Sequence, residues 1–385
     1  MPLTEEEKKQ RLIESIDKTG YGFEYTIHTE LKKHGWNIIP NRYYVDDVNQ
    51  IEREIDIVAY KSFIKDDIVY YTALIISCKK RADSSWVFLS SENEDDLNFD
   101  SFPISIISSD ERLALMIQKE KIKILEKIKN TDSFKALYNK PNRVFAYYQV
   151  NNQSVKNEDS KCIYDSIITS IKAMEYEMDA HKNYSVCDGK RTFYSFNLLS
   201  IFDGILYEIM HKDDKTIEVK EVDEIKYHNR HIINKKEKFY RVHFISGKAF
   251  PTIISQYDSL HRQGRELFSG LIDEFYDNIW KYDYRVDLYR KRFTDDLTRV
   301  LASLAFRYRL DNSIPIKSDD LRPLFYYDKT KQVLVIDLFA GEPYAKQLVD
   351  FYNTNPETSP KIKNLLDKYF RYKGDFTIIE NELPF

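Results

Sequence analysis

The chain is poor in the residues that build loops and covalent cross-links. Its 385 residues include only 10 glycines, 11 prolines and 3 cysteines. Scarce glycine and proline favour long regular elements and argue against disordered or linker-rich regions. The few scattered cysteines exclude a disulfide framework and a structural zinc site, so we expect a reducing, cytoplasmic location.

An excess of one charge and long apolar runs are also missing. Lys and Arg total 58 against 62 Asp and Glu, which gives no evidence for nucleic-acid binding but allows a local basic face. No apolar run approaches the length that spans a membrane, and the polar start MPLTEEEKKQR is unlike a signal peptide. We therefore expect no membrane partner.

Helical and strand patterns succeed one another along the first 250 residues. Residues 4–34 are predicted to be helical, and three extended segments follow at 36–45, 53–63 and 67–80. The next predicted elements are a helix at 110–130, a strand at 143–150, a helix at 163–182, and strands at 191–204 and 238–247. This alternation of helices and strands predicts an α/β fold.

The pattern changes near residue 256, where we predict a domain boundary. The first domain, 1–256, carries a helical insertion at about 105–140. The second domain, 257–385, is predicted to be mostly helical, with one β-hairpin at 323–339. No linker rich in proline, glycine or serine marks the boundary.

The stretch ALIISCKKR, residues 73–81, ends an apolar strand in polar and cationic side chains. Side chains alternate along a strand, so Ser77 and Lys79 share one face and Cys78 takes the other, as a core residue. In the preceding strand Glu54 and Asp56 also share a face. A turn centred near residues 65 and 66 would place Ser77 opposite Glu54, with Asp56 diagonally beside it. Acids, a serine and a lysine would then meet at one edge of a hairpin.

Such a cluster suits phosphodiester hydrolysis assisted by a divalent cation. Mg²⁺ prefers oxygen ligands and often binds through only one or two protein carboxylates. The ion polarises the phosphate and acidifies a water, and a nearby lysine can orient that water and stabilise the developing charge.

The helix that contains Phe23 and Glu24, the strand REIDIVAY and the strand LIISCKK resemble the PD-(D/E)xK nuclease superfamily, particularly its Mrr-like branch. The resemblance covers about residues 17–90, and the element order to about 204 fits the family's core. It implies a restriction endonuclease-like αβββαβ core, a mixed sheet flanked by helices, followed by the mostly helical C-terminal region. By position, Asp56 matches the metal-binding aspartate, Lys79 the catalytic lysine and Glu24 the supporting glutamate of the first helix.

The resemblance also implies a function, cofactor and partners. We expect a DNA endonuclease that uses Mg²⁺ or Mn²⁺, in prokaryotic restriction, anti-phage defence or a mobile element. A homodimer or a partner subunit of a defence system would fit. Candidate DNA contacts are Lys80 and Arg81 beside the site, and Arg290 and Arg292 in the C-terminal region.

Ser77 departs from the family motif, which has an acidic residue or glutamine two positions before the lysine. A third acid would have to replace it, and Glu54, Glu92 and Glu94 are the candidates. Ser77 itself could position a water through its hydroxyl. Two alternatives stay open: a catalytically degenerate nuclease fold that binds nucleic acid or protein, and an ordinary α/β protein with a structural Asp56–Lys79 pair.

Overall fold

The computed structural model describes residues 4–46, 48–92, 105–139, 141–183, 190–211, 216–312, 321–339 and 344–380. These residues form two compact units, which divide after Gly270. The boundary predicted near residue 256 falls inside a long helix, α7 (Phe250–Asp277), that runs across this division. No helix of the described ranges is long and apolar enough to cross a membrane.

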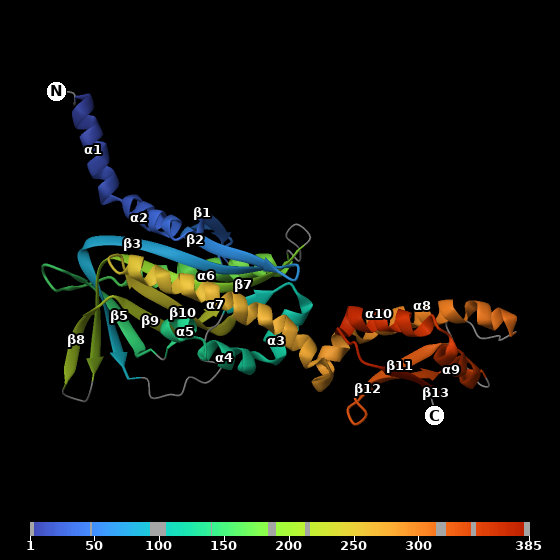
Figure 1. The fold of residues 1–385 in the computed structure, drawn as a ribbon. Helices are drawn as coiled ribbons and strands as arrows, with labels where there is room; N and C mark the ends of the chain where they lie inside the picture. The colour runs from blue at the N-terminus through green and yellow to red at the C-terminus, as the bar shows by residue number, and fades with distance from the viewer. Residues whose placement is uncertain are drawn as a thin grey trace. The chain divides into compact units, whose positions relative to one another are not determined.

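Unit 1 is a mixed α/β structure built on one large sheet (Figure 1). Its helices are α1 (Glu5–Lys18), α2 (Tyr21–Lys33), α3 (Glu111–Lys119), α4 (Lys121–Lys129), α5 (Asp132–Tyr138), α6 (Lys161–Asn183) and the larger part of α7. Its strands are β1 (Asn37–Val45), β2 (Glu52–Lys65), β3 (Ile68–Ser91), β4 (Ser105–Ser108), β5 (Arg143–Asn151), β6 (Asn157–Glu158), β7 (Arg191–His211), β8 (Ile217–Val222), β9 (Glu224–Ile233) and β10 (Lys236–Ser246). The helix predicted over 110–130 is two helices, because the chain leaves helical geometry at Glu120.

Two long parallel strands, β3 and β7, form the centre of the sheet. On its other edge β3 pairs first with β2 and then with β5. The path β1-β2-β3-β7-β10-β9 therefore mixes parallel and antiparallel neighbours. The mixed sheet predicted from the sequence is confirmed at this level.

Helices cover both faces of this sheet. Ile167 and Ile171 of α6 belong to one buried cluster with Ala73 and Ile75 of β3. Thr72, the neighbour of Ala73, instead contacts His261 of α7 through its hydroxyl at 3.0 Å. Because successive strand residues point to opposite faces, α6 and α7 lie on opposite sides of the sheet.

The β2–β3 hairpin turns over two residues with positive φ, Asp66 (52°) and Asp67 (60°). Both angles are typical of the turn that matches the twist of paired strands. The partners from Lys65↔Ile68 to Ile57↔Ile76 follow from this turn. The register is two residues away from the predicted one, because the turn lies one position further along the chain. The continuation of the ladder therefore places Asp56, and not Glu54, opposite Ser77.

The turn also leads to a prediction about stability. Asp67→Gly should raise the free energy of unfolding by about 0.5–1 kcal/mol, because glycine adopts positive φ without steric cost. Asp67→Val should lower it by about 1 kcal/mol, because a β-branched residue is strained there. Denaturant unfolding of both variants would check this. Equal stability of the two variants would contradict the role given to the turn geometry.

Unit 2 contains the end of α7, a short 3-10 helix η2 (Ile279–Lys281), and a small sheet with three further helices. The sheet consists of β11 (Arg322–Asp328), β12 (Val333–Phe339) and β13 (Phe376–Glu380). The helices are α8 (Asp283–Asp311), α9 (Ala345–Thr354) and α10 (Thr358–Phe370). Its core is aromatic. The ring of Phe293 is in edge contact with the rings of Phe325 and Phe370, at centroid distances of 4.6 Å and 5.0 Å. The predicted hairpin is present as β11–β12, and β13 adds a parallel strand that the sequence did not reveal.

Candidate active site at the fork between two strands

The candidate site lies where β2 separates from β3. The β2–β3 ladder ends at Ile57↔Ile76, while β2 continues to Glu52 paired with β1. On this edge of β3 the next neighbour, β5, begins only at Ser84. We call residues 52–56 of β2 and 77–83 of β3 the fork. The opposite edge of β3 stays paired with β7 from Ser77 to Lys80, which holds that side of the fork in place.

The carboxylate of Asp56 bridges the fork. Its Oδ2 accepts a hydrogen bond of 2.6 Å from the backbone N–H of Cys78. The same oxygen lies 3.3 Å from Ser77 Oγ and 3.4 Å from Lys79 Nζ. The contacts of Ser77 and Lys79 with one oxygen agree with the predicted sharing of a face. Asp56 therefore replaces the missing backbone partner of β3 and also meets the predicted lysine.

Burial divides these residues into accessible and inaccessible groups. The side chains of Asp56 and Lys79 are 21% and 25% exposed, so solvent or a substrate can reach both. Ser77 is 0% exposed, and its hydroxyl donates to Asp56. Ser77 thus orients the carboxylate of Asp56 from a buried position. The expectation that its hydroxyl positions a water does not fit this burial.

Glu24 of α2 completes an acidic neighbourhood at the fork. Partial burial, followed by the negative charges of Asp56 and Glu54, raises the pKa of Glu24, while Lys79 acts in the opposite direction. The carboxylate of Glu24 has no hydrogen bond or ion pair with a described residue. Glu24 is therefore close enough to Asp56 and Lys79 for their charges to shift its pKa, and its carboxylate oxygens can still act as acceptors.

The three candidates for a third acid have different outcomes. Glu54 accepts a hydrogen bond from Asn41 of β1, and its charge acts on Glu24. Glu92 follows the last residue of β3, and at about 3.3 Å per residue the strand path from Lys79 is roughly 40 Å. The interpretation of Glu92 as a member of this site is therefore wrong, because β3 continues as a strand to Ser91 and carries Glu92 away from Lys79. Glu94 lies outside the described residues.

Cys78 is buried, as predicted for a core residue. Burial, reinforced by the charges of Asp56 and Glu24, raises the pKa of its thiol. A thiol that stays protonated is a poor nucleophile, so Cys78 is not a candidate nucleophile of the fork.

The fork has some of the features of a divalent-cation site. Among the described residues no three His, Cys, Asp or Glu side chains converge as a metal-binding group. However, all the hydrogen bonds that the Asp56 carboxylate forms with described residues go to Oδ2, so Oδ1 keeps its capacity to bind a cation. A hard cation with Asp56, Glu24 and several waters as ligands would match the sparse protein ligation typical of Mg²⁺.

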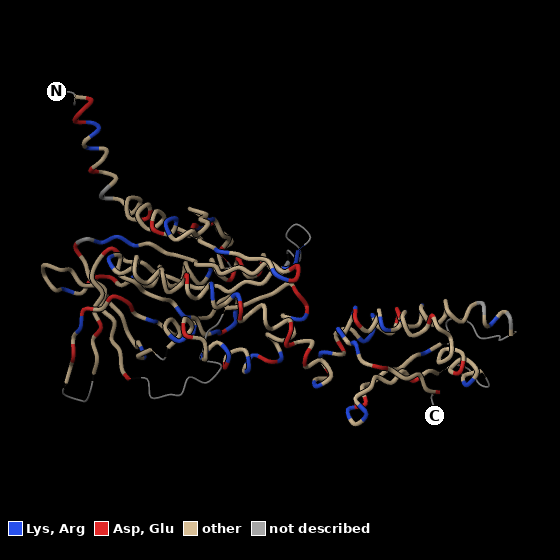
Figure 2. Tube along the Cα trace, in the orientation of Figure 1, with Lys and Arg blue, Asp and Glu red and all other residues tan. Residues whose placement is uncertain are grey.

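The predicted DNA contacts lie in both units. Lys80 is 4.0 Å from Asp203, and Arg81 is exposed beside Cys162 at the start of α6. In unit 2 Arg290 pairs with Asp287 at 2.7 Å, and Arg292 donates to a backbone carbonyl of its own helix. Figure 2 shows Lys and Arg interspersed with Asp and Glu along the chain, α8 included. Lys79, Lys80 and Arg81 form a run of three cations at the fork, whereas the cations of α8 are mixed with acids.

One hydrogen-bonded cluster of polar side chains near the fork was not predicted from the sequence. Glu158 of β6 accepts hydrogen bonds from Ser84 at 2.9 Å and from Gln149 at 2.7 Å, and these bonds lower its pKa. Arg81 contributes to the same shift. The group forms only because β5 and β6 pair beside β3, so no local pattern predicts it.

Comparisons of the chain with protein-family models, with curated proteins and with solved structures give no match. The functional argument therefore rests on the geometry of the fork.

Proposed function

We propose that this protein is a nuclease that hydrolyses phosphodiester bonds in DNA at the fork, with Mg²⁺ or Mn²⁺ as cofactor. The observation that carries the proposal is the meeting of Asp56 and Lys79 across two separating strands, at 3.4 Å. Glu24, whose pKa is raised, lies beside them. Two carboxylates near a lysine, with Asp56 and Lys79 accessible from solvent, suit metal-assisted phosphodiester hydrolysis.

The order of elements supports a restriction endonuclease-like core for the same region. We infer that α2, β1, β2, β3, α6 and β7 correspond to its αβββαβ succession. The strand order β1-β2-β3-β7, with β7 parallel to β3, agrees with a mixed sheet that carries acids and lysine on adjacent strands. A role in prokaryotic restriction, defence or a mobile element follows from this resemblance alone.

Each residue of the fork has a distinct role in this proposal. Asp56 and Glu24 would hold the divalent cation, which polarises the scissile phosphate and makes a water more acidic. Lys79 would orient the attacking water and stabilise negative charge on the phosphate. Ser77 and the backbone N–H of Cys78 keep the Asp56 carboxylate in position through its Oδ2.

A second candidate function is a nuclease fold without catalysis that binds nucleic acid or protein. The observation in its favour is the buried Ser77 hydroxyl, which stands where the resemblance expects a carboxylate. The hydrogen bond from Cys78 to Asp56 gives the acid a structural task as well. The two candidates differ in what the loss of Lys79 would do.

Lys79→Met should reduce DNA cleavage at least about 100-fold, because the variant loses the charge that acts on water and phosphate. The measurement is cleavage of plasmid and single-stranded DNA in Mg²⁺ or Mn²⁺, with EDTA as the metal-free reference. Lys135→Met is a matched control, because Lys135 is an exposed lysine in unit 1 whose ion-pair partner is Asp132. Wild-type cleavage that survives in Lys79→Met, or no cleavage by the wild type, would favour the second candidate.

A further inference from the structure

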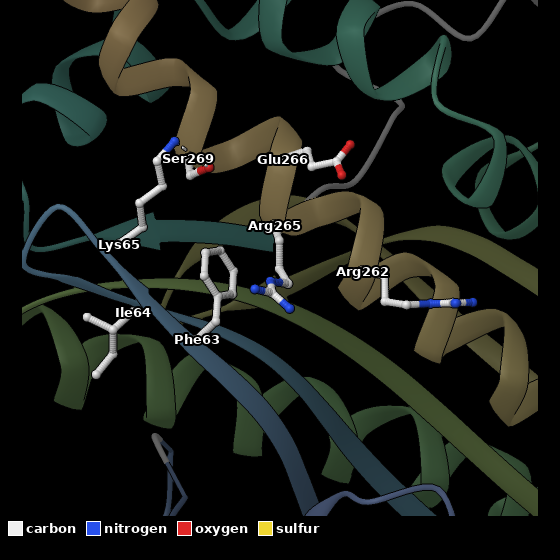
Figure 3. Close-up of a pocket in the computed structure, with 7 residues that line it drawn as sticks. All are labelled: Phe63, Ile64, Lys65, Arg262, Arg265, Glu266 and Ser269. Atoms are coloured by element: carbon white, nitrogen blue, oxygen red, sulfur yellow. Dashed lines mark hydrogen bonds between the residues drawn. The ribbon is translucent and has the colours of Figure 1, made fainter.

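A second candidate site lies at the opposite end of the β2–β3 hairpin. An open pocket of about 560 Å³ is formed by the end of β2 and by α7 (Figure 3). Its lining residues are Phe63, Ile64, Lys65, Arg262, Arg265, Glu266 and Ser269. The strand path from Lys65 to Asp56 is roughly 30 Å at about 3.3 Å per residue, so this pocket is separate from the fork.

The charge of the lining residues is predominantly positive. Lys65, Arg262 and Arg265 oppose a single acid, Glu266. Neither arginine forms an ion pair with a described residue, and Figure 3 shows the Glu266 carboxylate turned away from Arg265. Lys61, two residues before Phe63 on the same strand, is by contrast paired with Asp258 at 2.7 Å. The pocket therefore holds two guanidinium groups whose charge the described residues leave uncompensated.

Arg265 is held in place before any ligand arrives. The ring of Phe63 stacks on Tyr70 at a centroid distance of 4.7 Å, and the guanidinium of Arg265 lies 5.0 Å from the centroid of the same ring. A guanidinium over an aromatic ring loses less freedom on binding, and its planar fork of donors matches the oxygens of a phosphate.

Helix geometry brings the other donors to the same side. Arg262, Arg265 and Ser269 follow one another at spacings of three and four along α7, so they share a face. Lys65 Nζ lies 3.3 Å from the hydroxyl of Ser269, which is itself buried. The pocket thus has an ammonium group and a hydroxyl at one end and two guanidinium groups further along α7, and Figure 3 shows Arg262 pointing away from Lys65.

We propose that this pocket is a binding site for a phosphate group. Its volume exceeds that of one phosphate and suits a nucleotide-sized ligand or a short stretch of nucleic-acid backbone. Both ligands present the same chemistry, an oxyanion with several acceptors. The proposal does not depend on catalysis at the fork, and binding can be measured in EDTA, where metal-dependent cleavage is absent.

The experiment measures binding of two probes to the full chain in EDTA. Inorganic pyrophosphate is titrated by calorimetry, and a labelled 30-base-pair DNA duplex is titrated by fluorescence anisotropy at several salt concentrations. Arg265→Gln and Arg262→Gln remove one cation each. Arg230→Gln is the matched control, because Arg230 is an exposed arginine of unit 1 that also lies over a phenylalanine ring, that of Phe239 at 4.6 Å.

We expect each pocket variant to bind the recognised probe about tenfold more weakly than the wild type and Arg230→Gln do. Pyrophosphate binding would identify a free phosphorylated molecule as the ligand. Binding of DNA alone, with a salt dependence whose slope falls by about one in Arg265→Gln, would identify a nucleic-acid backbone. Absence of binding to both probes, or equal affinity of Arg265→Gln and Arg230→Gln, would overturn the site. DNA binding that is insensitive to both pocket arginines would leave the nuclease proposal intact and exclude this pocket.

Discussion

Asp56→Asn should abolish metal-dependent DNA cleavage, with a loss of at least about 1,000-fold, while the protein stays folded. Asparagine keeps the size of the side chain, and its amide oxygen can still accept the hydrogen bond from the backbone N–H of Cys78. It lacks the negative charge that would hold a divalent cation and pair with Lys79. A loss of this size corresponds to about 4 kcal/mol of transition-state stabilisation, within the range that a metal ion supplies.

Asp56→Ala separates the catalytic role of this residue from its structural role. Alanine removes the acceptor of the Cys78 N–H on an edge of β3 where no strand of the described residues pairs in its place. We expect an additional loss of about 1–3 kcal/mol in the free energy of unfolding, the usual cost of a buried donor without a partner. Single-turnover cleavage and thermal denaturation of both variants would measure the two effects independently.

Asp203→Asn provides the matched control for this pair. Asp203 is an acid on the neighbouring strand β7, 4.0 Å from Lys80, and its side chain is 44% exposed. Its amide variant should cleave DNA within a few-fold of the wild type. Full activity of Asp56→Asn would refute the assignment of Asp56 as a metal ligand. Equal stability of the Asn and Ala variants would refute its role as the acceptor for β3.

The pairing of Asp56 with Lys79 was accessible from the sequence, because it depends on local rules. Alternation along a strand places Ser77 and Lys79 on the same face. A short turn then pairs their strand with the strand that carries Asp56. The exact register of the two strands could not be predicted from the sequence. Asp66 and Asp67 both adopt positive φ, and aspartate is a less specific signal for such a turn than asparagine or glycine. A shift of one position in the turn was enough to exchange Glu54 for Asp56 opposite Ser77.

The position of Glu92 could not be predicted from the sequence for a different reason. The stretch SSENEDDLNFDS, residues 90–101, is polar and acidic, which is typical of a loop that could return toward the site. In the structure β3 extends to Ser91, because β5 replaces β2 as its neighbour from Ser84 onward. Strand length therefore depends on a partner that begins more than fifty residues later, at Arg143. Such long-range pairing also explains why β13 and the Glu158 group were not predicted.

Acid should destabilise the fold through buried histidines, of which His243 is hydrogen-bonded on both ring nitrogens. His243 of β10 is 0% exposed, with Nε2 2.6 Å from Glu224 and Nδ1 2.8 Å from the hydroxyl of Tyr257. In the neutral ring Nε2–H donates to the carboxylate and Nδ1 accepts from the tyrosine. Burial lowers the pKa of His243 to about 4; Glu224 opposes this shift, and Arg241 and Lys226 add to it.

His261 of α7 adds a second group with the same behaviour. Burial, together with the charges of Lys61 and Arg265, lowers its pKa to about 4, while Asp258 acts in the opposite direction. Its Nδ1 contacts the hydroxyl of Thr72 on β3. Protonation of either histidine therefore places a poorly solvated charge between α7 and the sheet.

The pKa values determine the direction of the effect. Each histidine has a lower pKa in the folded chain, about 4, than the usual 6.5 of the unfolded chain. The unfolded state then binds more protons between these values, so stability is complete above pH 6.5 and is lost as the pH falls toward 4. The loss is on the order of 3 kcal/mol for each histidine. Glu224, whose pKa is lowered to about 2, loses its contribution only below about pH 4.5.

Thermal denaturation between pH 8 and pH 4 would measure this loss. We expect a nearly constant melting temperature down to about pH 6.5 and a progressive fall below it. His243→Gln should be less stable at pH 8, yet its melting temperature should fall less on acidification, because its amide cannot be protonated in this range. The exposed His211 is the matched control, and His211→Gln should follow the wild-type curve. Parallel curves for His243→Gln and the wild type would show that acid acts elsewhere in the protein.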